Sequence, residues 1–217
     1  MPKPTRNEEQ IEQVRESIVQ GALDLIVEEG YENLTMVRLG SRLKMTGANL
    51  YNYFQNRDAL IIAIHKKIFS LLHEKLSRAV QDLSTPLERV KSLVGAFVDF
   101  GVENANIYDI AFSRPRRHYS AYKGTPLEAK AYEEYLSSFE VLVLANRVME
   151  DFLKTKGLVA PPETQFLVIK FLSELHGIIS LYNSGLLPEI AADPAGTLQA
   201  VTQEITKRIA DIKNPHL

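Results

Sequence analysis

The sequence predicts an all-α protein with a small N-terminal helix-turn-helix domain and a larger helical domain after it. Apolar residues recur at three- and four-residue steps along most of the 217-residue chain, and glycine and proline separate these stretches. A buried strand could compete only over residues 166–172, but the apolar character continues to Tyr182, which is longer than strands usually are. The pattern therefore predicts about nine helices.

Composition narrows the class of protein. The chain is 45% hydrophobic and 24% charged, which is typical of a globular protein. It contains no cysteine, so it cannot build disulfides, thiolate nucleophiles, zinc–thiolate sites or iron–sulfur clusters. The basic segment 1–7 lacks the apolar core of a signal peptide, and no stretch approaches the ~20 apolar residues that span a bilayer. We therefore expect a cytoplasmic protein with no membrane partner.

Capping residues mark the helices of the N-terminal part. Gly30 stands just past an amphipathic stretch, as a helix C-cap does, and Thr35, Thr46 and Asn56 each stand where an N-cap is expected. The helices expected here cover residues 9–29, 35–43, 46–54 and 56–83.

Prolines mark the helices of the remaining chain. Pro86, Pro126, Pro161 and Pro194 each stand at the start of an apolar periodic stretch, where proline is tolerated in a helix. The helices expected here cover residues 86–105, 107–112, 126–156, 161–185 and 194–213.

Two short helices joined by a three-residue turn over residues 35–54 form the pattern of a helix-turn-helix. Leu39 and Leu43 on the first helix, and Leu50 and Phe54 on the second, are i, i+4 pairs that can close a small core with the neighbouring helices. Gly40 has no side chain, so it would let the second helix approach the first closely.

The second helix of this motif suits a major groove. Asparagine can bind an adenine edge with two hydrogen bonds, small residues admit a thymine methyl group, and tyrosine hydroxyls reach phosphate. Helix N-termini and Arg57 favour phosphate as well. Residues 33–67 hold six basic residues and one acid, a net +5, in a chain of net charge −2. We predict that DNA is bound by Arg38, Lys44, Thr46, Gly47, Ala48, Asn49, Tyr51, Asn52, Tyr53, Asn56 and Arg57; an ordinary helical hairpin with a polar face is the alternative.

Residues 9–70 resemble the DNA-binding domain of the tetracycline-repressor (TetR) family. The match rests on the helix ending in glycine, on the threonine cap, and on Leu50-Tyr51-Asn52-Tyr53-Phe54 followed by a short polar link, Arg57 and Leu60. The resemblance implies phosphate contacts from Tyr51, Tyr53 and Arg57, and a groove position for residues 46–49 and Asn52. One position departs from the family. Lys44 stands where the turn usually holds glycine, so a left-handed backbone there would cost about 1 kcal/mol unless a different turn relieves it.

The resemblance also implies a C-terminal helical domain for dimerisation and for a small-molecule inducer. Residues 166–182 are apolar nearly all round, so this helix must be covered on two sides. The last helix is apolar along one side, and two such helices from each of two chains would form a four-helix dimer interface. The segment 175–185, with His176-Gly177, also resembles the regulatory domain of one branch of the family. We place the DNA-binding domain at residues 1–55 and the ligand-binding and dimerisation domain at residues 56–217.

Two features could bind the inducer. A set of apolar and aromatic residues could line a pocket or form ordinary core: Phe97, Phe100, Tyr108, Phe112, Phe139, Leu142, Met149 and His176. The basic loop 113–124 could hold an anionic effector such as an acyl-CoA phosphate, or could be a solvated loop.

The sequence holds no constellation of catalytic residues, metal ligands or cofactor-binding motifs that we recognise, so we expect no enzyme and assign no metal or cofactor. We expect a homodimeric, sequence-specific transcriptional repressor that binds double-stranded operator DNA and is released by a small hydrophobic effector. The alternatives are a helical binding protein that keeps the motif as a scaffold, and a helical enzyme.

Overall fold

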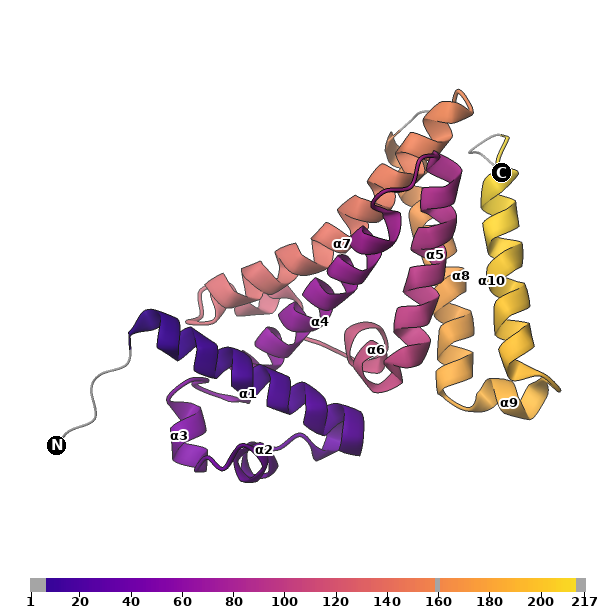
Figure 1. Ribbon diagram of the computed structural model, residues 1–217. Helices are drawn as coiled ribbons and strands as arrows, with labels where there is room; N and C mark the ends of the chain where they lie inside the picture. Colours follow the sequence, from indigo (N-terminus) through magenta and orange to yellow (C-terminus); the bar gives the residue numbers. More distant parts are fainter. Residues whose placement is uncertain (1–6, 159–160, 214–217) are drawn as a thin grey trace. The chain divides into compact units, whose positions relative to one another are not determined.

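The computed structural model describes residues 7–158 and 161–213, so most of the basic segment 1–7 lies outside it. The described residues form ten α-helices and two short 3-10 helices with no strand (Figure 1). The all-α fold class is confirmed.

The helices pack into two compact units. The first comprises residues Met1–Ile68 and Arg114–Leu136, and the second comprises Phe69–Ser113 and Ser137–Leu217. The first unit contains α1 (Glu8–Glu29), α2 (Met36–Leu43), α3 (Gly47–Tyr51), the 3-10 helices Tyr31–Asn33 and Tyr119–Tyr122, and the first parts of α4 (Arg57–Val80) and α7 (Glu128–Thr155). The second contains the remainders of α4 and α7, with α5 (Pro86–Glu103), α6 (Ala105–Phe112), α8 (Pro161–Asn183), α9 (Leu186–Ile190) and α10 (Pro194–Ala210). The functional boundary after residue 55 stays a prediction.

The predicted capping residues cap their helices. The Thr35 hydroxyl accepts a hydrogen bond from the Arg38 amide at 3.1 Å, and the Thr46 hydroxyl accepts one from the Asn49 amide at 3.2 Å. Asn56 Oδ1 accepts one from the amide of Ala59 at 2.9 Å. Gly30 ends α1 with a φ of +85°, a backbone conformation that favours glycine.

Helices α1, α2 and α3 share a small core. Leu39 and Leu50 are fully buried there, and Leu43 packs against α1 so closely that a Cβ atom on Gly21 would lie 2.6 Å from its Cδ2. A Cβ atom on Gly40 would lie 2.7 Å from the carbonyl oxygen of Met45 in the turn. The close approach predicted at Gly40 is therefore present, and the backbone of the turn is its nearest neighbour.

Two details differ from the sequence prediction. Helix α3 ends at Tyr51 rather than at Phe54, because the chain turns at residues 52–53 and buries Tyr53 and Phe54. Helix α9 was not predicted, since it has only five residues and contains Pro188.

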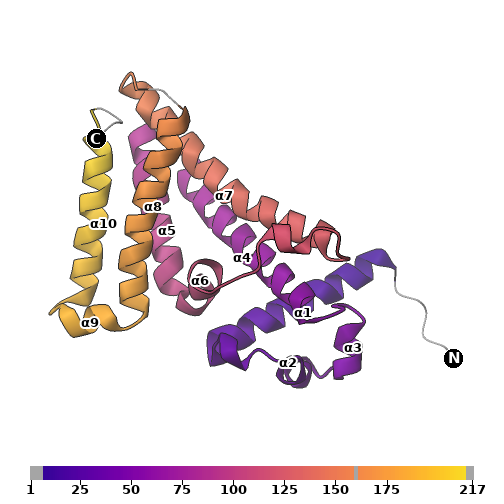
Figure 2. The same cartoon turned by 180° about the vertical axis from the view of Figure 1, so that it is seen from behind.

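In the second unit α5, α8 and α10 run side by side in both Figure 1 and Figure 2. Gly101 on α5 permits this packing, because a Cβ atom there would lie 2.8 Å from Ile179 Cγ2 on α8. The Asn183 side chain of α8 also donates a hydrogen bond to the Gly101 carbonyl at 2.9 Å.

The expectation that no stretch could span a bilayer needs a correction. Residues Glu163–Asn183 of α8 are long and apolar enough by length and composition alone. In the structure this helix packs against α5, α6 and α10 and buries Phe171, Leu175 and Ile179, which is the environment of a core helix in a globular domain.

Candidate nucleic-acid interface

The N-terminal end of α3 holds the residues that we predict to lie in a DNA groove. Ala48 and Asn52 are exposed, Gly47 and Asn49 are half-buried, and Leu50 on the opposite side is buried in the core. The exposed residues are small or carry amides, so this end of α3 has no formal charge that would need a phosphate or an acid as partner. It can meet base edges through hydrogen bonds and methyl contacts.

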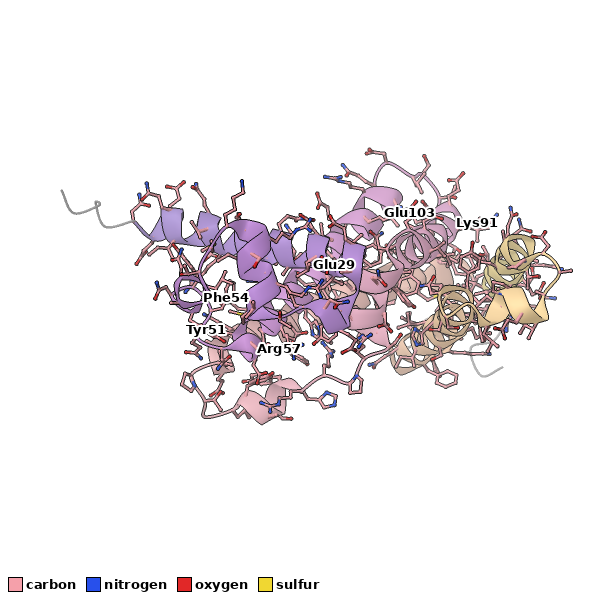
Figure 3. The ribbon with its side chains drawn as sticks, turned by 90° about the horizontal axis from the view of Figure 1, so that it is seen from below. Glu29, Tyr51, Phe54, Arg57, Lys91 and Glu103 are labelled. Carbon is pink, nitrogen blue, oxygen red and sulfur yellow. The ribbon has the colours of Figure 1, made fainter. Side chains whose placement is uncertain are left out.

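Tyr51 and Arg57 lie beside this surface. Tyr51 is the last residue of α3 and its side chain is 51% exposed, while Arg57 is exposed at the first residue of α4 (Figure 3). The Arg57 guanidinium carbon lies 5.5 Å from the centre of the Tyr31 ring, a cation–π contact that orients it. Thr46, at the start of α3, and Asn56 are exposed as well. All four can reach phosphate from helix ends.

Tyr53 is placed differently from the other predicted DNA contacts. Its side chain is only 8% exposed, and its backbone carbonyl accepts a hydrogen bond from Arg15 Nε of α1 at 3.3 Å. The structure therefore places Tyr53 in the packing between α1 and the end of α3, apart from the exposed surface of α3.

Lys44 adopts the left-handed conformation that its position in the turn requires. Its φ and ψ are 53° and 38°, and its amide donates to the Ser41 carbonyl. The turn thus keeps the left-handed backbone that a glycine would take, at the steric cost that a Cβ atom has there, and the lysine side chain is exposed. Lys44 therefore does not force a different type of turn between α2 and α3.

The two arginines of α2 are paired with acids at the end of α1. Arg38 donates to Asn33 Oδ1 at 2.9 Å and forms an ion pair with Glu29, and Arg42 binds both carboxylate oxygens of Glu28 at 2.6 Å. The hydrogen bond from Arg42 holds the pKa of Glu28 below its usual value. The net charge of +5 over residues 33–67 therefore overstates the positive charge of this surface, because Glu28 and Glu29 lie outside the counted residues but pair with two of their arginines.

Three exposed residues of α2 were not among the predicted contacts: Val37, Ser41 and Arg42. Val37 is 75% exposed although it is apolar, and Arg42 lies one turn after Arg38. The signal for Val37 was available in the sequence, since it falls outside the apolar stripe of Met36, Leu39 and Leu43.

Ion pairs within the first unit hold the basic loop 113–124. Arg114 pairs with Glu32, and Arg117 binds Asp58 Oδ2 at 2.7 Å. These pairs attach the loop to the helix-turn-helix region, although most of its residues stay exposed to solvent.

Arg116 of the same loop takes part in a buried polar cluster. It donates to Glu134 Oε1 at 2.5 Å, and Nδ1 of His65 lies 3.9 Å from the same oxygen. Burial, assisted by the nearby charge of Arg116, lowers the pKa of His65 to about 4. Burial raises the pKa of Glu134, against the opposing effect of Arg116. His65 is therefore neutral at pH 7, which agrees with a separation longer than a hydrogen bond.

The predicted pocket residues fall into two groups in the second unit. Phe97, Tyr108, Phe112 and His176 come together with ring centres 4.7–6.2 Å apart, and Phe69, which was not predicted, joins them through Phe112 at 6.0 Å. Phe100 and Met149 are buried, Leu142 is half-buried, and Phe139 is 47% exposed. The structure thus gathers four of the eight residues into one aromatic cluster and leaves Phe139 on the surface.

The aromatic cluster contains one polar pair. The Tyr108 hydroxyl lies 2.9 Å from Nδ1 of His176, and burial raises the pKa of Tyr108, so the hydroxyl stays protonated and can donate this hydrogen bond. His176 also lies 3.4 Å from the Ser180 hydroxyl. These contacts match a hydrogen-bonded core histidine.

A helix-turn-helix whose second helix exposes an uncharged surface, flanked by groups that can bind phosphate, is the arrangement found in DNA-binding transcription regulators. Residues 18–64 match the model of the family described as bacterial regulatory proteins, tetR family. This N-terminal part of the chain is therefore similar to the DNA-binding domain of TetR-family transcriptional regulators.

Curated relatives agree with this class. The chain is 28% identical over 184 residues to the uncharacterized HTH-type transcriptional regulator Rv0681 of Mycobacterium tuberculosis (strain ATCC 25618 / H37Rv), a match over 84% of this chain and 76% of the relative. It is 25% identical over 87 residues to the HTH-type transcriptional regulator HbdR of Aromatoleum sp. (strain CIB), over 40% of this chain and 38% of HbdR. The second match thus spans well under two thirds of that relative.

Solved structures share the fold. A protein of unknown function from Rhodococcus sp. RHA1 has a TM-score of 0.70 at 19% identity, over 97% of this chain and 100% of that one. AibR in complex with isovaleryl coenzyme A and operator DNA has a TM-score of 0.59 at 19% identity, over 89% and 96%. The regulator FadR from Bacillus subtilis in complex with stearoyl-CoA has a TM-score of 0.62 at 13% identity, over 90% and 97%.

Proposed function

We propose that this protein is a homodimeric transcriptional repressor that binds a specific operator through α3 and is released by a small hydrophobic effector. It acts in the cytoplasm and catalyses no reaction. The observation that carries the proposal is the α3 surface: groove-compatible residues lie at its N-terminal end, and Thr46, Tyr51, Asn56 and Arg57 surround them with groups that bind phosphate.

The outer side of α8 supports a homodimer. Phe166 is 61% and Ile169 is 49% exposed, and a Cβ atom on Gly177 would meet no atom within 4 Å, so the backbone is open to close approach. Ile179, in contrast, is fully buried against Gly101 within its own chain. A second copy that packs α8 and α10 against the same helices would cover this side and form a four-helix interface.

Three observations support an effector that acts on DNA binding. The aromatic cluster around Tyr108 and His176 offers rings and one polar pair, the composition of many small-molecule sites. Two structural neighbours, AibR and FadR of Bacillus subtilis, were solved with acyl-coenzyme A compounds. Helices α4 and α7 each begin in the first unit and continue into the second, so a change in either helix can pass between the units. The effector must prefer a conformation that binds operator poorly.

The test is an unbiased selection of duplex DNA with the purified full-length protein, followed by titration of the selected duplex. The proposal requires a pseudo-palindromic site whose half-sites lie about 34–36 Å apart or a multiple of that spacing, and an affinity that falls as salt rises. Acyl-CoAs, fatty acids and aromatic compounds are then screened by thermal shift. A compound that raises the melting temperature must also weaken operator binding, with an expected coupling of about 1–3 kcal/mol. Failure to enrich any duplex would refute the proposed function.

A further inference from the structure

Glu28 and Glu29, at the end of α1, form ion pairs with the two arginines of α2, which is the helix before α3. In a helix-turn-helix complex the first helix crosses the DNA backbone, so Arg38 and Arg42 stand on the helix that faces phosphates. In the free protein each guanidinium already has a carboxylate partner. Figure 3 labels Glu29 at the end of α1, Tyr51 at the end of α3 and Arg57 at the start of α4.

We propose that Glu28 and Glu29 are specificity determinants, which limit sequence-independent DNA binding by keeping Arg42 and Arg38 paired when no operator is bound. This inference rests on the proposed function. It assigns a role to two acidic residues outside the predicted DNA contacts, and it adds Arg42 to the residues predicted to bind the DNA backbone.

The geometry of the Arg42–Glu28 pair supports this role. Two parallel hydrogen bonds of 2.6 Å join the guanidinium to both carboxylate oxygens, which is the arrangement in which arginine also grips a phosphate. Carboxylate and phosphate therefore compete for the same face of Arg42. The hydrogen bond between the partners lowers the pKa of Glu28 and raises that of Arg42, so both stay charged through the neutral range.

The Arg38–Glu29 pair has an additional support. Arg38 also donates to Asn33 Oδ1 at 2.9 Å, and Asn33 Nδ2 donates to the Glu29 carbonyl at 2.6 Å. The guanidinium is thus held between a carboxylate and an amide that are both anchored at the end of α1. A loosely docked duplex without a matching sequence must displace these partners to recruit Arg38.

Both pairs are at the surface, where water and salt weaken them. The side chain of Arg38 is 52% exposed and that of Glu28 is 56% exposed. Such pairs are weak enough for an operator complex to exchange them for phosphate once α3 fixes the register of the backbone. In an unmatched duplex the register is not fixed, and the resident carboxylates retain the arginines.

The experiment compares wild-type protein with the double variant Glu28→Gln, Glu29→Gln on the selected operator and on a random duplex, between about 50 and 200 mM salt. We expect the affinity for the random duplex to rise roughly threefold or more, and its salt slope to steepen by up to about 1.8, which is 0.9 for each recruited arginine. The operator slope stays the same, so the ratio of operator to random affinity falls.

Two controls separate this effect from net charge. The double variant Glu12→Gln, Glu74→Gln makes the same change in charge at acids that pair with an arginine of their own helix, and it should leave the random-duplex slope unchanged. The glutamine changes at 28 and 29 should also have no effect in a protein that carries Arg38→Ala and Arg42→Ala. Thermal unfolding checks that every variant is folded.

The outcomes distinguish the two ideas. If the wild-type protein binds no duplex with dependence on salt, the proposed function itself fails, and the inference with it. If the wild-type protein binds its operator but the glutamine variant keeps the wild-type slope, only the inference is overturned. The inference would also be overturned if the affinity for the random duplex rose in the protein that lacks the two arginines, or if the charge-matched control variant showed the same rise.

Discussion

The phenolic oxygen of Tyr108 lies 2.9 Å from Nδ1 of His176, and this contact joins α6 to α8 inside the aromatic cluster of the second unit. Both rings also stack, with centres 5.7 Å apart. With the Ser180 hydroxyl, the pair forms the polar part of an otherwise apolar region, so it couples the packing of α6 to that of α8.

Tyr108→Phe isolates the hydrogen bond, because it keeps the ring that packs against Phe97 and Phe112. We expect the free energy of unfolding to fall by about 1 kcal/mol, since His176 loses a buried partner. Urea unfolding measures this change. The matched control is Tyr119→Phe, whose hydroxyl bonds Glu128 at 3.3 Å nearer the surface and should matter less. Equal effects at both positions would contradict the assigned role.

Gly40→Ala tests the close approach of α2 to the turn. The new Cβ atom would lie 2.7 Å from the Met45 carbonyl oxygen, which is backbone and cannot move alone, so we expect a loss of about 1–3 kcal/mol in unfolding free energy. Gly47→Ala is the control, because a Cβ atom there meets nothing within 4 Å. It should leave stability nearly unchanged and alter only DNA affinity. A Gly40→Ala protein as stable as wild type would show that the turn can shift.

Lys44→Gly should separate stability from DNA binding. Glycine takes the left-handed backbone of this position without steric strain, so we expect a gain of up to about 1 kcal/mol in stability, reduced by the greater freedom of the unfolded chain. Loss of the lysine charge should lower the salt slope of operator binding by about 0.9. Thermal unfolding and salt titration read the two effects independently. A variant with lower stability and an unchanged slope would contradict both expectations.

His65 predicts a dependence of stability on pH. Its pKa is about 4 in the folded protein, against an ordinary value of 6.5 for a solvated histidine, so between these values the unfolded chain binds more protons and stability falls as the pH is lowered. The full contribution is at most roughly 3 kcal/mol. Glu134, whose pKa is raised, contributes in the opposite direction as the pH rises. Urea unfolding at several pH values between 4 and 7 should show a flatter profile for His65→Gln than for wild type; identical profiles would refute this account.

Ile169→Asp tests the dimer interface. Ile169 is 49% exposed in the single chain, so aspartate should be tolerated there, but in a dimer it would bury an unpaired charge. We expect monomers at micromolar concentration by light scattering, with weaker operator binding. Val143→Asp introduces the same charge on exposed α7 and should leave the dimer intact. A wild-type monomer at micromolar concentration would end the proposal of a homodimer.

Periodicity and capping residues predicted nine of the helices because each has an apolar stripe, a polar or proline start, or a glycine end. Helix α9 was not predicted, because five residues that include a proline are too few to show a helical period of apolar residues. The early end of α3 was not predicted either. Leu50 and Phe54 have helical spacing, but Phe54 lies after the end of the helix and is buried there.

The electrostatic surroundings of the motif depended on tertiary packing. Glu28 and Arg42 are 14 residues apart and on different helices, so no local rule of charge spacing joins them. The prediction of the pocket residues also depended on tertiary packing. Helical spacing does not tell which side of α7 is covered, and Phe139 is exposed where the sequence alone allowed it in a pocket.

The most direct test of the central claim, that the N-terminal end of α3 reads bases, is to repeat the DNA selection with Asn49→Ala and with Arg57→Ala. Asn49→Ala should relax the preference at one base position in each half-site, at a cost of about 1–3 kcal/mol, and leave the salt slope unchanged. Arg57→Ala should keep every base preference and lower the slope by about one unit. Selected sequences and slopes that are the same as wild type for both variants would contradict the claim.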